Sequence, residues 1–147
     1  MILAPLVAAS VIGCTSAFGP PSGWPHASQT NFVAGPLWFT GLRTYAQALP
    51  SAQPDGWYFA KTPTALRTGH TAVVRIDVRD RGWARLEYGR LDKVGAVTFS
   101  SCPRAGGVWT GWAGGFIVKR PGCVHFSVSV DGAPARKLKV ALGQACT

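Results

Sequence analysis

Charged residues are scarce in this chain, and acidic ones are the scarcest. Its 147 residues include six Asp or Glu and fifteen Lys or Arg, so that 14 % are charged, against about 25 % in an average soluble protein. Asp77 and Glu87 belong to the outward sides of expected strands, and Asp131 to an expected turn. Paired carboxylates facing one cleft, which glycoside hydrolysis requires, are therefore not expected.

Recognisable catalytic and metal-binding motifs are also missing. The chain has no Gly-x-Ser-x-Gly, His-Glu-x-x-His, P-loop or dinucleotide fingerprint. It has no closely spaced Cys or His pair for zinc. Ser127, His125 and Asp131 could be drawn as a triad, but strand positions two apart do not give triad geometry. The sequence predicts a protein that is not an enzyme and holds no cofactor or metal.

No apolar run is long enough for a membrane-spanning helix, which needs about 20 residues. The uncharged N-terminus instead ends in Val11-Ile12-Gly13-Cys14, a cysteine after a small residue, as in bacterial lipoprotein signals. We predict a signal peptide over 1–13 and lipidation of Cys14, although the segment is short and has no basic residue. A plain secretory signal cut elsewhere, or a buried strand of a cytosolic protein, are the alternatives.

The rest of the chain divides into a tether and one folded domain. Residues 14–31 are rich in Ser, Gly, Pro and Thr, a composition typical of flexible segments. Residues 32–147 show apolar and polar residues in alternation, most clearly over 123–130, where four apolar side chains share one face. Further strands are expected at 70–78, 84–88, 96–100, 116–118 and 138–142, with weaker ones at 33–39 and 57–60.

These strands and the turns between them predict an all-β fold. Seven or eight short antiparallel strands favour an immunoglobulin-like β-sandwich, with a small barrel as the competitor. The best helical candidate is the short segment 42–49. No internal repeat is present.

The cysteines predict at least one disulfide. If Cys14 carries a lipid, Cys102, Cys123 and Cys146 remain, giving one pair and one leftover. Cys102 ends one expected strand and Cys123 begins another, so we favour this pair. Cys123 with Cys146, across the Asp131-Gly132 hairpin, stays open as the alternative.

Two groups of residues are candidates for binding. Trp109 and Trp112 stand in a Gly-rich stretch that is typical of a loop, where indole rings could stack on sugar rings. Packing in the core is the competing interpretation. Arg136, Lys137 and Lys139 are the most one-sided basic cluster of a chain whose net charge is +9. Such a surface attracts anionic lipid or acidic wall polysaccharide; zinc-finger spacings, RNP motifs and basic helices are absent, so nucleic acid is not an expected partner.

Three stretches, Val97-Thr98-Phe99-Ser100-Ser101-Cys102-Pro103, Gly114-Gly115-Phe116-Ile117-Val118 and Pro121-Gly122-Cys123-Val124, precede a closing Leu142-Gly143 and Cys146. In this order they resemble uncharacterised actinobacterial secreted proteins and putative lipoproteins with one β-sandwich domain. The resemblance implies location and fold, and no activity.

The expected protein is therefore extracytoplasmic, anchored to the outer face of the cell membrane or secreted. We expect a non-catalytic module that contacts an anionic or carbohydrate partner of the envelope. An accessory subunit or structural protein that acts through protein–protein contacts is the alternative, and an enzyme of unknown class is the second.

Overall fold

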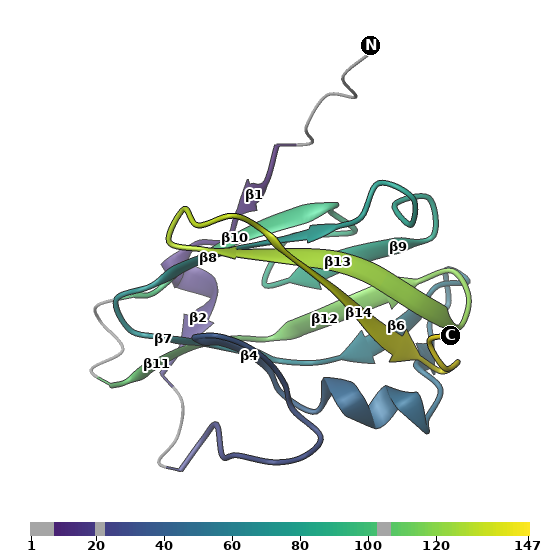
Figure 1. Ribbon diagram of the computed structural model, residues 1–147, viewed down its shortest axis with the longest axis horizontal. Helices are drawn as coiled ribbons and strands as arrows, with labels where there is room; N and C mark the ends of the chain where they lie inside the picture. The colour runs from purple at the N-terminus through teal and green to yellow at the C-terminus, as the bar shows by residue number, and fades with distance from the viewer. Residues whose placement is uncertain (1–7, 20–22, 103–106) are drawn as a thin grey trace.

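The computed structural model describes residues 8–19, 23–102 and 107–147, and these residues form an all-β fold (Figure 1). They contain fourteen strands and two short 3₁₀ helices, η1 (Cys14–Ser16) and η2 (Leu42–Ala46). The strands form three open sheets, each with a different strand at either edge. Within the described ranges, no helix is long and apolar enough to cross a membrane.

Sheet A is one layer of the molecule. Its order is β1 (Ser10–Val11), β10 (Ala96–Ser100), β8 (Thr71–Ile76), β13 (Gly122–Val130) and β14 (Arg136–Leu142). All neighbours are antiparallel except β1 and β10. The alternation over β13 places one side of the strand on the core, because Val124, Phe126 and Val128 are buried while His125 and Ser127 are only partly covered.

Sheets B and C together make the second layer. Sheet B has the order β2 (Ala17–Phe18), β11 (Trp109–Trp112), β7 (Thr64–Arg67), β4 (Leu37–Phe39) and β3 (Phe32–Ala34). Sheet C has the order β5 (Ser51–Ala52), β6 (Tyr58–Lys61), β12 (Gly114–Val118) and β9 (Ala84–Tyr88). The chain passes directly from β6 to β7 and from β11 to β12, so the two sheets are continuous in sequence.

The strand pairing is interrupted at two places between sheets B and C, between β6 and β7 and between β11 and β12, and each interruption has a local cause. Pro63 has no N–H to donate to a ladder, which ends β6. On the partner strand Gly114 has φ 153° and lies so close to β9 that a Cβ would collide with the Glu87 carbonyl oxygen. The Thr62 N–H donates to the Gly114 carbonyl oxygen at 2.9 Å, so the two interruptions lie side by side and are hydrogen-bonded to each other.

The core between the layers is built around aromatic rings. The ring centroid of Phe39 lies 5.8 Å from that of Phe116 and 5.8 Å from that of Phe126. At the other end of the core the Phe99 ring lies 5.1 Å from Tyr88 and 5.2 Å from Trp112. The buried Tyr88 hydroxyl donates to the Thr62 carbonyl oxygen at 2.8 Å, and burial raises its pKa well above the usual value.

The predicted all-β sandwich is confirmed, and every strand expected from alternation is present. The predicted number of strands was too small, because the two breaks each divide one long strand and short strands were overlooked. The segment Trp109–Trp112, expected in a loop, is strand β11. The helical candidate 42–49 contains only the 3₁₀ helix Leu42–Ala46.

The N-terminal segment contains two short strands where the structure describes it. β1 pairs with β10, Ile12 is 4 % exposed within the core, and β2 pairs with β11. The apolar side chain of Ile12 is buried in the core, and Phe18 packs on sheet B, which explains why residues 10–18 lie against the sheets. Residues 1–7 of the expected signal peptide and 20–22 of the expected tether lie outside the described residues.

The disulfides correct the favoured cysteine pairing. Cys14 is bonded to Cys102, and Cys123 to Cys146, with Cα–Cα separations of 5.9 and 4.9 Å. The pairing of Cys102 with Cys123 was wrong because β10 and β13 both run antiparallel to β8. The end of β10 and the start of β13 therefore lie at opposite ends of sheet A. The alternative pairing of Cys123 with Cys146 is confirmed.

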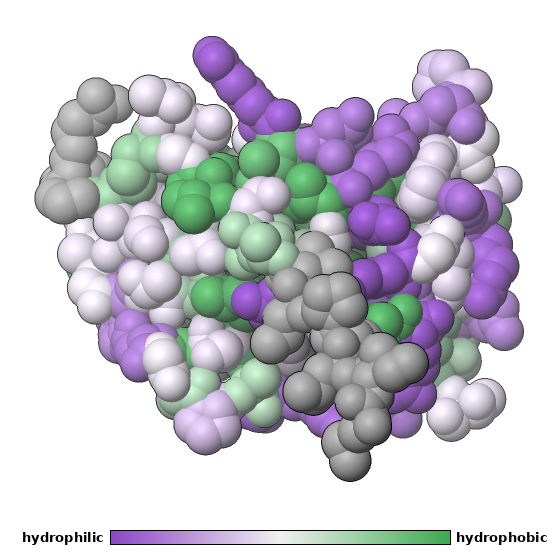
Figure 2. Space-filling model, turned by 90° about the horizontal axis from the view of Figure 1, so that it is seen from above, coloured by the Kyte–Doolittle hydropathy of each residue, from purple (hydrophilic) through white to green (hydrophobic). Residues whose placement is uncertain are grey.

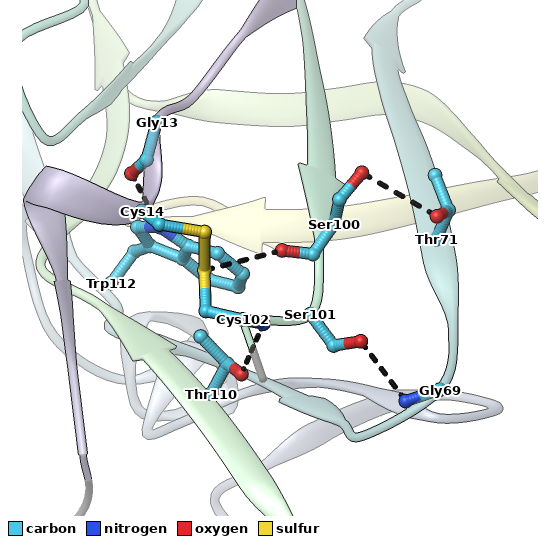
Figure 3. Close-up of a disulfide and its surroundings, with 9 residues drawn as sticks. All are labelled: Gly13, Cys14, Gly69, Thr71, Ser100, Ser101, Cys102, Thr110 and Trp112. Atoms are coloured by element: carbon cyan, nitrogen blue, oxygen red, sulfur yellow. Dashed lines mark hydrogen bonds between the residues drawn. A yellow bond between two sulfur atoms is a disulfide. The ribbon is translucent and has the colours of Figure 1, made fainter. Parts of the chain in front are cut away.

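The Cys14–Cys102 disulfide joins the exposed Cys14 to the buried Cys102, and hydrogen bonds hold both ends (Figure 3). The Cys102 N–H donates to the Thr110 hydroxyl at 3.0 Å, and the Trp112 indole N–H donates to the Gly13 carbonyl oxygen at 3.4 Å. A lipid anchor on Cys14 would require the sulfur that this disulfide uses, so the two states exclude each other. Two disulfides indicate an oxidising, extracytoplasmic environment.

Candidate functional site

The outer side of sheet B carries aromatic residues where a sandwich normally presents polar ones. On β4, Leu37 and Phe39 are buried in the core, and Trp38 between them is partly exposed on the other side. The same alternation runs through the neighbouring strands. We call the resulting surface the aromatic face; its residues are Phe18, Trp24, Val33, Trp38, Ala65, Arg67, Trp109 and Gly111.

Two tryptophans lie at the centre of the aromatic face. The ring centroids of Trp38 and Trp109 are 4.9 Å apart, and the planes meet at 60°. The Arg67 guanidinium lies over the Trp109 ring at 4.8 Å from its centroid. Ala65 pairs with Trp38 in the ladder and is fully buried. Val33, opposite Trp38 in the ladder, is 46 % exposed.

A second aromatic pair comes from the N-terminal segment. Phe18 is opposite Gly111 in the ladder between β2 and β11, and its ring lies 5.3 Å from that of Trp24. A Cβ on Gly111 would overlap the Phe18 ring and approach Trp24 to 3.1 Å. Glycine at this position therefore lets the Phe18 ring lie directly on the strand.

The structure separates the two predicted tryptophans. Trp109 belongs to the aromatic face, whereas Trp112 is fully buried and packs on Phe99 in the core. Trp112 is therefore not available as a platform; the interpretation as core packing holds for it. Sequence reasoning missed Trp38, whose signal was a lone indole between the two core residues of β4.

The outer side of sheet A is polar and contains a small pocket. Seen from above, hydrophilic residues gather toward the right of the molecule (Figure 2). The pocket, which we call the sheet A pocket, has a volume of about 220 Å³. Its lining residues are Asp77, Arg79, His125, Phe126, Lys137, Leu138 and Lys139.

A buried carboxylate fixes the histidine of this pocket. Asp80 is 6 % exposed, and its Oδ2 accepts the backbone N–H of His125 at 2.7 Å. The same Oδ2 lies 2.9 Å from His125 Nδ1. A carboxylate oxygen accepts only from a protonated nitrogen, so Nδ1 carries hydrogen and the pair sets the ring orientation.

Asp77 is the acidic residue of the pocket lining, and it is held by its neighbours. Its Oδ1 accepts the Arg79 backbone N–H at 3.0 Å and Arg79 Nε at 3.4 Å. The first of these hydrogen bonds and the Arg79 charge lower the pKa of Asp77. The Asp77 N–H in turn donates to the His125 carbonyl oxygen at 2.8 Å.

Two of the three residues of the predicted basic cluster line the sheet A pocket, and the third does not. Lys139 pairs with His125, and Lys137 with Ser127, which brings both lysines to the pocket. Arg136 is exposed on the same strand and does not line the pocket. In the ranges that the structure describes, neither lysine forms an ion pair.

The described residues do not bring His125 and Asp131 together as a catalytic triad would require, and they contain no free cysteine. Asp131 contacts His70, with Oδ2 2.7 Å from Nδ1, and not His125. All four cysteines are in disulfides. The described residues contain no group of three or more His, Cys, Asp or Glu that could hold a metal ion.

Comparison with known proteins returns no relative: no protein-family model, no curated protein and no solved structure matches the chain. The geometry of the two outer faces is therefore the basis for assigning a function.

Proposed function

We propose that this protein is exported and binds a carbohydrate polymer of the cell envelope through the aromatic face of sheet B. The observation that carries the proposal is that tryptophan, phenylalanine and valine lie on the outer side of a sheet, where polar residues are usual. Val33 is 46 % exposed, and the half-buried Trp38 and Trp109 keep part of their rings in contact with solvent. A contiguous apolar patch of this kind marks an interaction site.

The chemistry of the aromatic face suits sugar rings. An indole offers a flat apolar surface together with an N–H donor, and a pyranose offers an apolar C–H face edged by hydroxyl groups. Trp38 and Trp109 are held by strands, so little side-chain freedom is lost on binding. The Arg67 guanidinium, which lies over the Trp109 ring, adds donors for hydroxyl or carboxylate groups.

Charge favours a neutral or acidic polymer over a basic partner. Arg67 is the one charged member of the aromatic face, and no carboxylate belongs to it. A cationic protein surface would therefore meet a like charge there. Sugars with or without acidic substituents would not.

Export in a free, secreted form is the part of the proposal that concerns Cys14. The disulfide with Cys102 favours secretion over the lipid anchor, because one sulfur cannot serve both. The intact mass of the protein from the native host, alkylated with and without prior reduction, tests this. We expect no added alkyl group before reduction, four after it, and no acyl mass. A diacylglyceryl group on Cys14 would refute the secreted form.

Binding is tested by retention of the purified protein on an envelope polysaccharide fraction from the native host. We expect the double variant Trp38→Ala/Trp109→Ala to lose affinity about 30-fold or more, as for buried aromatic anchors in other interfaces. Trp57→Ala is the matched control, because this indole contacts Lys93 and Lys119 away from sheet B.

Equal retention of the double variant and the wild-type protein would refute the assignment of this face. A stable protein complex recovered by crosslinking in the native host, with no affinity for the polysaccharide, would favour the accessory role instead.

A further inference from the structure

The residues that line the sheet A pocket carry more positive than negative charge. Arg79, Lys137 and Lys139 line it, and Asp77 is the one carboxylate in its wall. Asp77 contacts Arg79, which leaves the two lysine charges without an acidic partner in the described part of the chain. Their spacing follows from the ladder, in which both project from β14 toward the outer side of β13.

His125 adds a ring nitrogen with a fixed direction, which in the neutral ring accepts a hydrogen bond from a P–OH group and in the protonated ring donates one to a phosphate oxygen. Because Asp80 accepts the hydrogen of Nδ1, the second ring nitrogen, Nε2, remains for a ligand in the pocket. Asp80 is almost fully buried and also accepts the His125 backbone N–H, so the ring does not depend on a ligand for its orientation.

The size of the pocket restricts what it can hold. A volume of about 220 Å³ is below the range of roughly 300–1,000 Å³ that drug-sized ligands occupy. The pocket therefore fits one charged group of a larger ligand. Lys137 and Lys139 offer two ammonium groups with no acidic partner among the described residues, which suits an anion with several acceptor oxygens, such as phosphate.

We propose that the sheet A pocket is a binding site for a phosphate group, held by Lys137, Lys139 and His125. The site lies on the layer opposite the aromatic face, so the two surfaces point away from each other and bind independently. The protein is then able to hold a phosphate-bearing partner on one side and a sugar polymer on the other.

Nuclear magnetic resonance with inorganic phosphate as the probe tests the site directly. We expect the ring resonances of His125 to shift saturably, while those of His70, which is bonded to Asp131, do not follow. This measurement uses the unaltered protein, so it does not depend on the folding of any variant. Absence of a His125 shift would overturn the proposal.

Matched variants separate a pocket from general attraction of anions. Lys137→Gln/Lys139→Gln should weaken phosphate binding about tenfold or more, as expected for lost hydrogen bonds to a charged group. Arg136→Gln/Lys119→Gln removes the same charge from exposed positions outside the pocket and should change the affinity less than about twofold. Equal losses in both pairs would overturn the proposal, because they would show charge attraction without a site.

Vesicles distinguish the two sources of phosphate. If a lipid head group is the natural partner, the protein should bind vesicles of phosphatidylglycerol mixed with phosphatidylcholine, and the Lys137→Gln/Lys139→Gln pair should not. If the phosphate belongs to a soluble molecule or a polymer, the His125 shift persists without vesicle binding. Either result supports the site; vesicle binding that survives the lysine pair, together with no His125 shift, contradicts it. Loss of polysaccharide binding by the tryptophan variants bears on the aromatic face alone.

Discussion

Replacing the Cys14–Cys102 disulfide should cost more stability than replacing Cys123–Cys146, because the loop that it closes is longer. The bonded residues are 88 apart in the first case and 23 in the second. In the chain-entropy model these separations correspond to about 4.6 and about 3.4 kcal/mol of unfolding free energy. The difference between the two double variants is therefore expected to be about 1 kcal/mol.

The assay is unfolding in urea of Cys14→Ala/Cys102→Ala and Cys123→Ala/Cys146→Ala beside the wild-type protein. Alanine is the replacement because Cys102 is 5 % exposed and a serine hydroxyl there would be buried. A control with the wild-type protein under reducing conditions should lose more than either variant. If the Cys14 and Cys102 variant were as stable as the wild-type protein, the N-terminal segment would not be part of the cooperative fold, and the reasoning would fail.

Two further predictions concern single side chains. Trp112→Ala should lower the unfolding free energy by about 3–5 kcal/mol, because it leaves a cavity beside Phe99; a smaller loss than Trp109→Ala shows would contradict its place in the core. The Thr71 N–H and His70 hold the pKa of Asp131 below its usual value, so this carboxylate stabilises the fold at neutral pH. The stability difference between wild type and Asp131→Asn should accordingly shrink as the pH falls from about 5 to about 2 in thermal unfolding; a difference independent of pH would contradict it.

Much of the fold could be predicted because alternation along a strand depends only on which side faces the core. On β13, Val124, Phe126 and Val128 follow the pattern, and all three are buried. The pattern fails at the strand end, because the strand expected over 70–78 ends at Ile76 and Val78 beyond it is 66 % exposed.

β11 could not be recognised because Gly111 and the glycines on either side of the strand indicate a loop when the sequence is considered alone. Gly111 lies beneath the Phe18 ring, and Gly114 passes close to the Glu87 backbone. Both are needed for contacts with segments far away in the sequence. Composition alone cannot distinguish a glycine that bends the chain from one that admits a neighbour.

The disulfides and the N-terminal segment depended on tertiary structure in the same way. Cys102 and Cys123 each adjoin a strand, but only the position of β8 between those strands shows that they are far apart. The partner of Cys102 is Cys14, in a segment whose Gly and Pro content indicated a tether.

The candidate sites were predicted in part. Lys137 and Lys139 alternate with apolar residues, so their outward direction followed from the sequence, and so did the outward direction of His125. Their meeting in one pocket with Arg79 required the pairing of β13 with β14 and the turn after β8. The aromatic face required the order of five strands, which brings Trp38 and Trp109 together across β7.

The central claim is that the aromatic face of sheet B binds sugar, and the six indole N–H resonances of the tryptophans test it most directly. On titration with a soluble envelope polysaccharide, the account predicts that the resonances of Trp38 and Trp109 shift together while that of the buried Trp112 remains in place. Resonances of Trp38 and Trp109 that do not change at saturating polysaccharide would contradict the account.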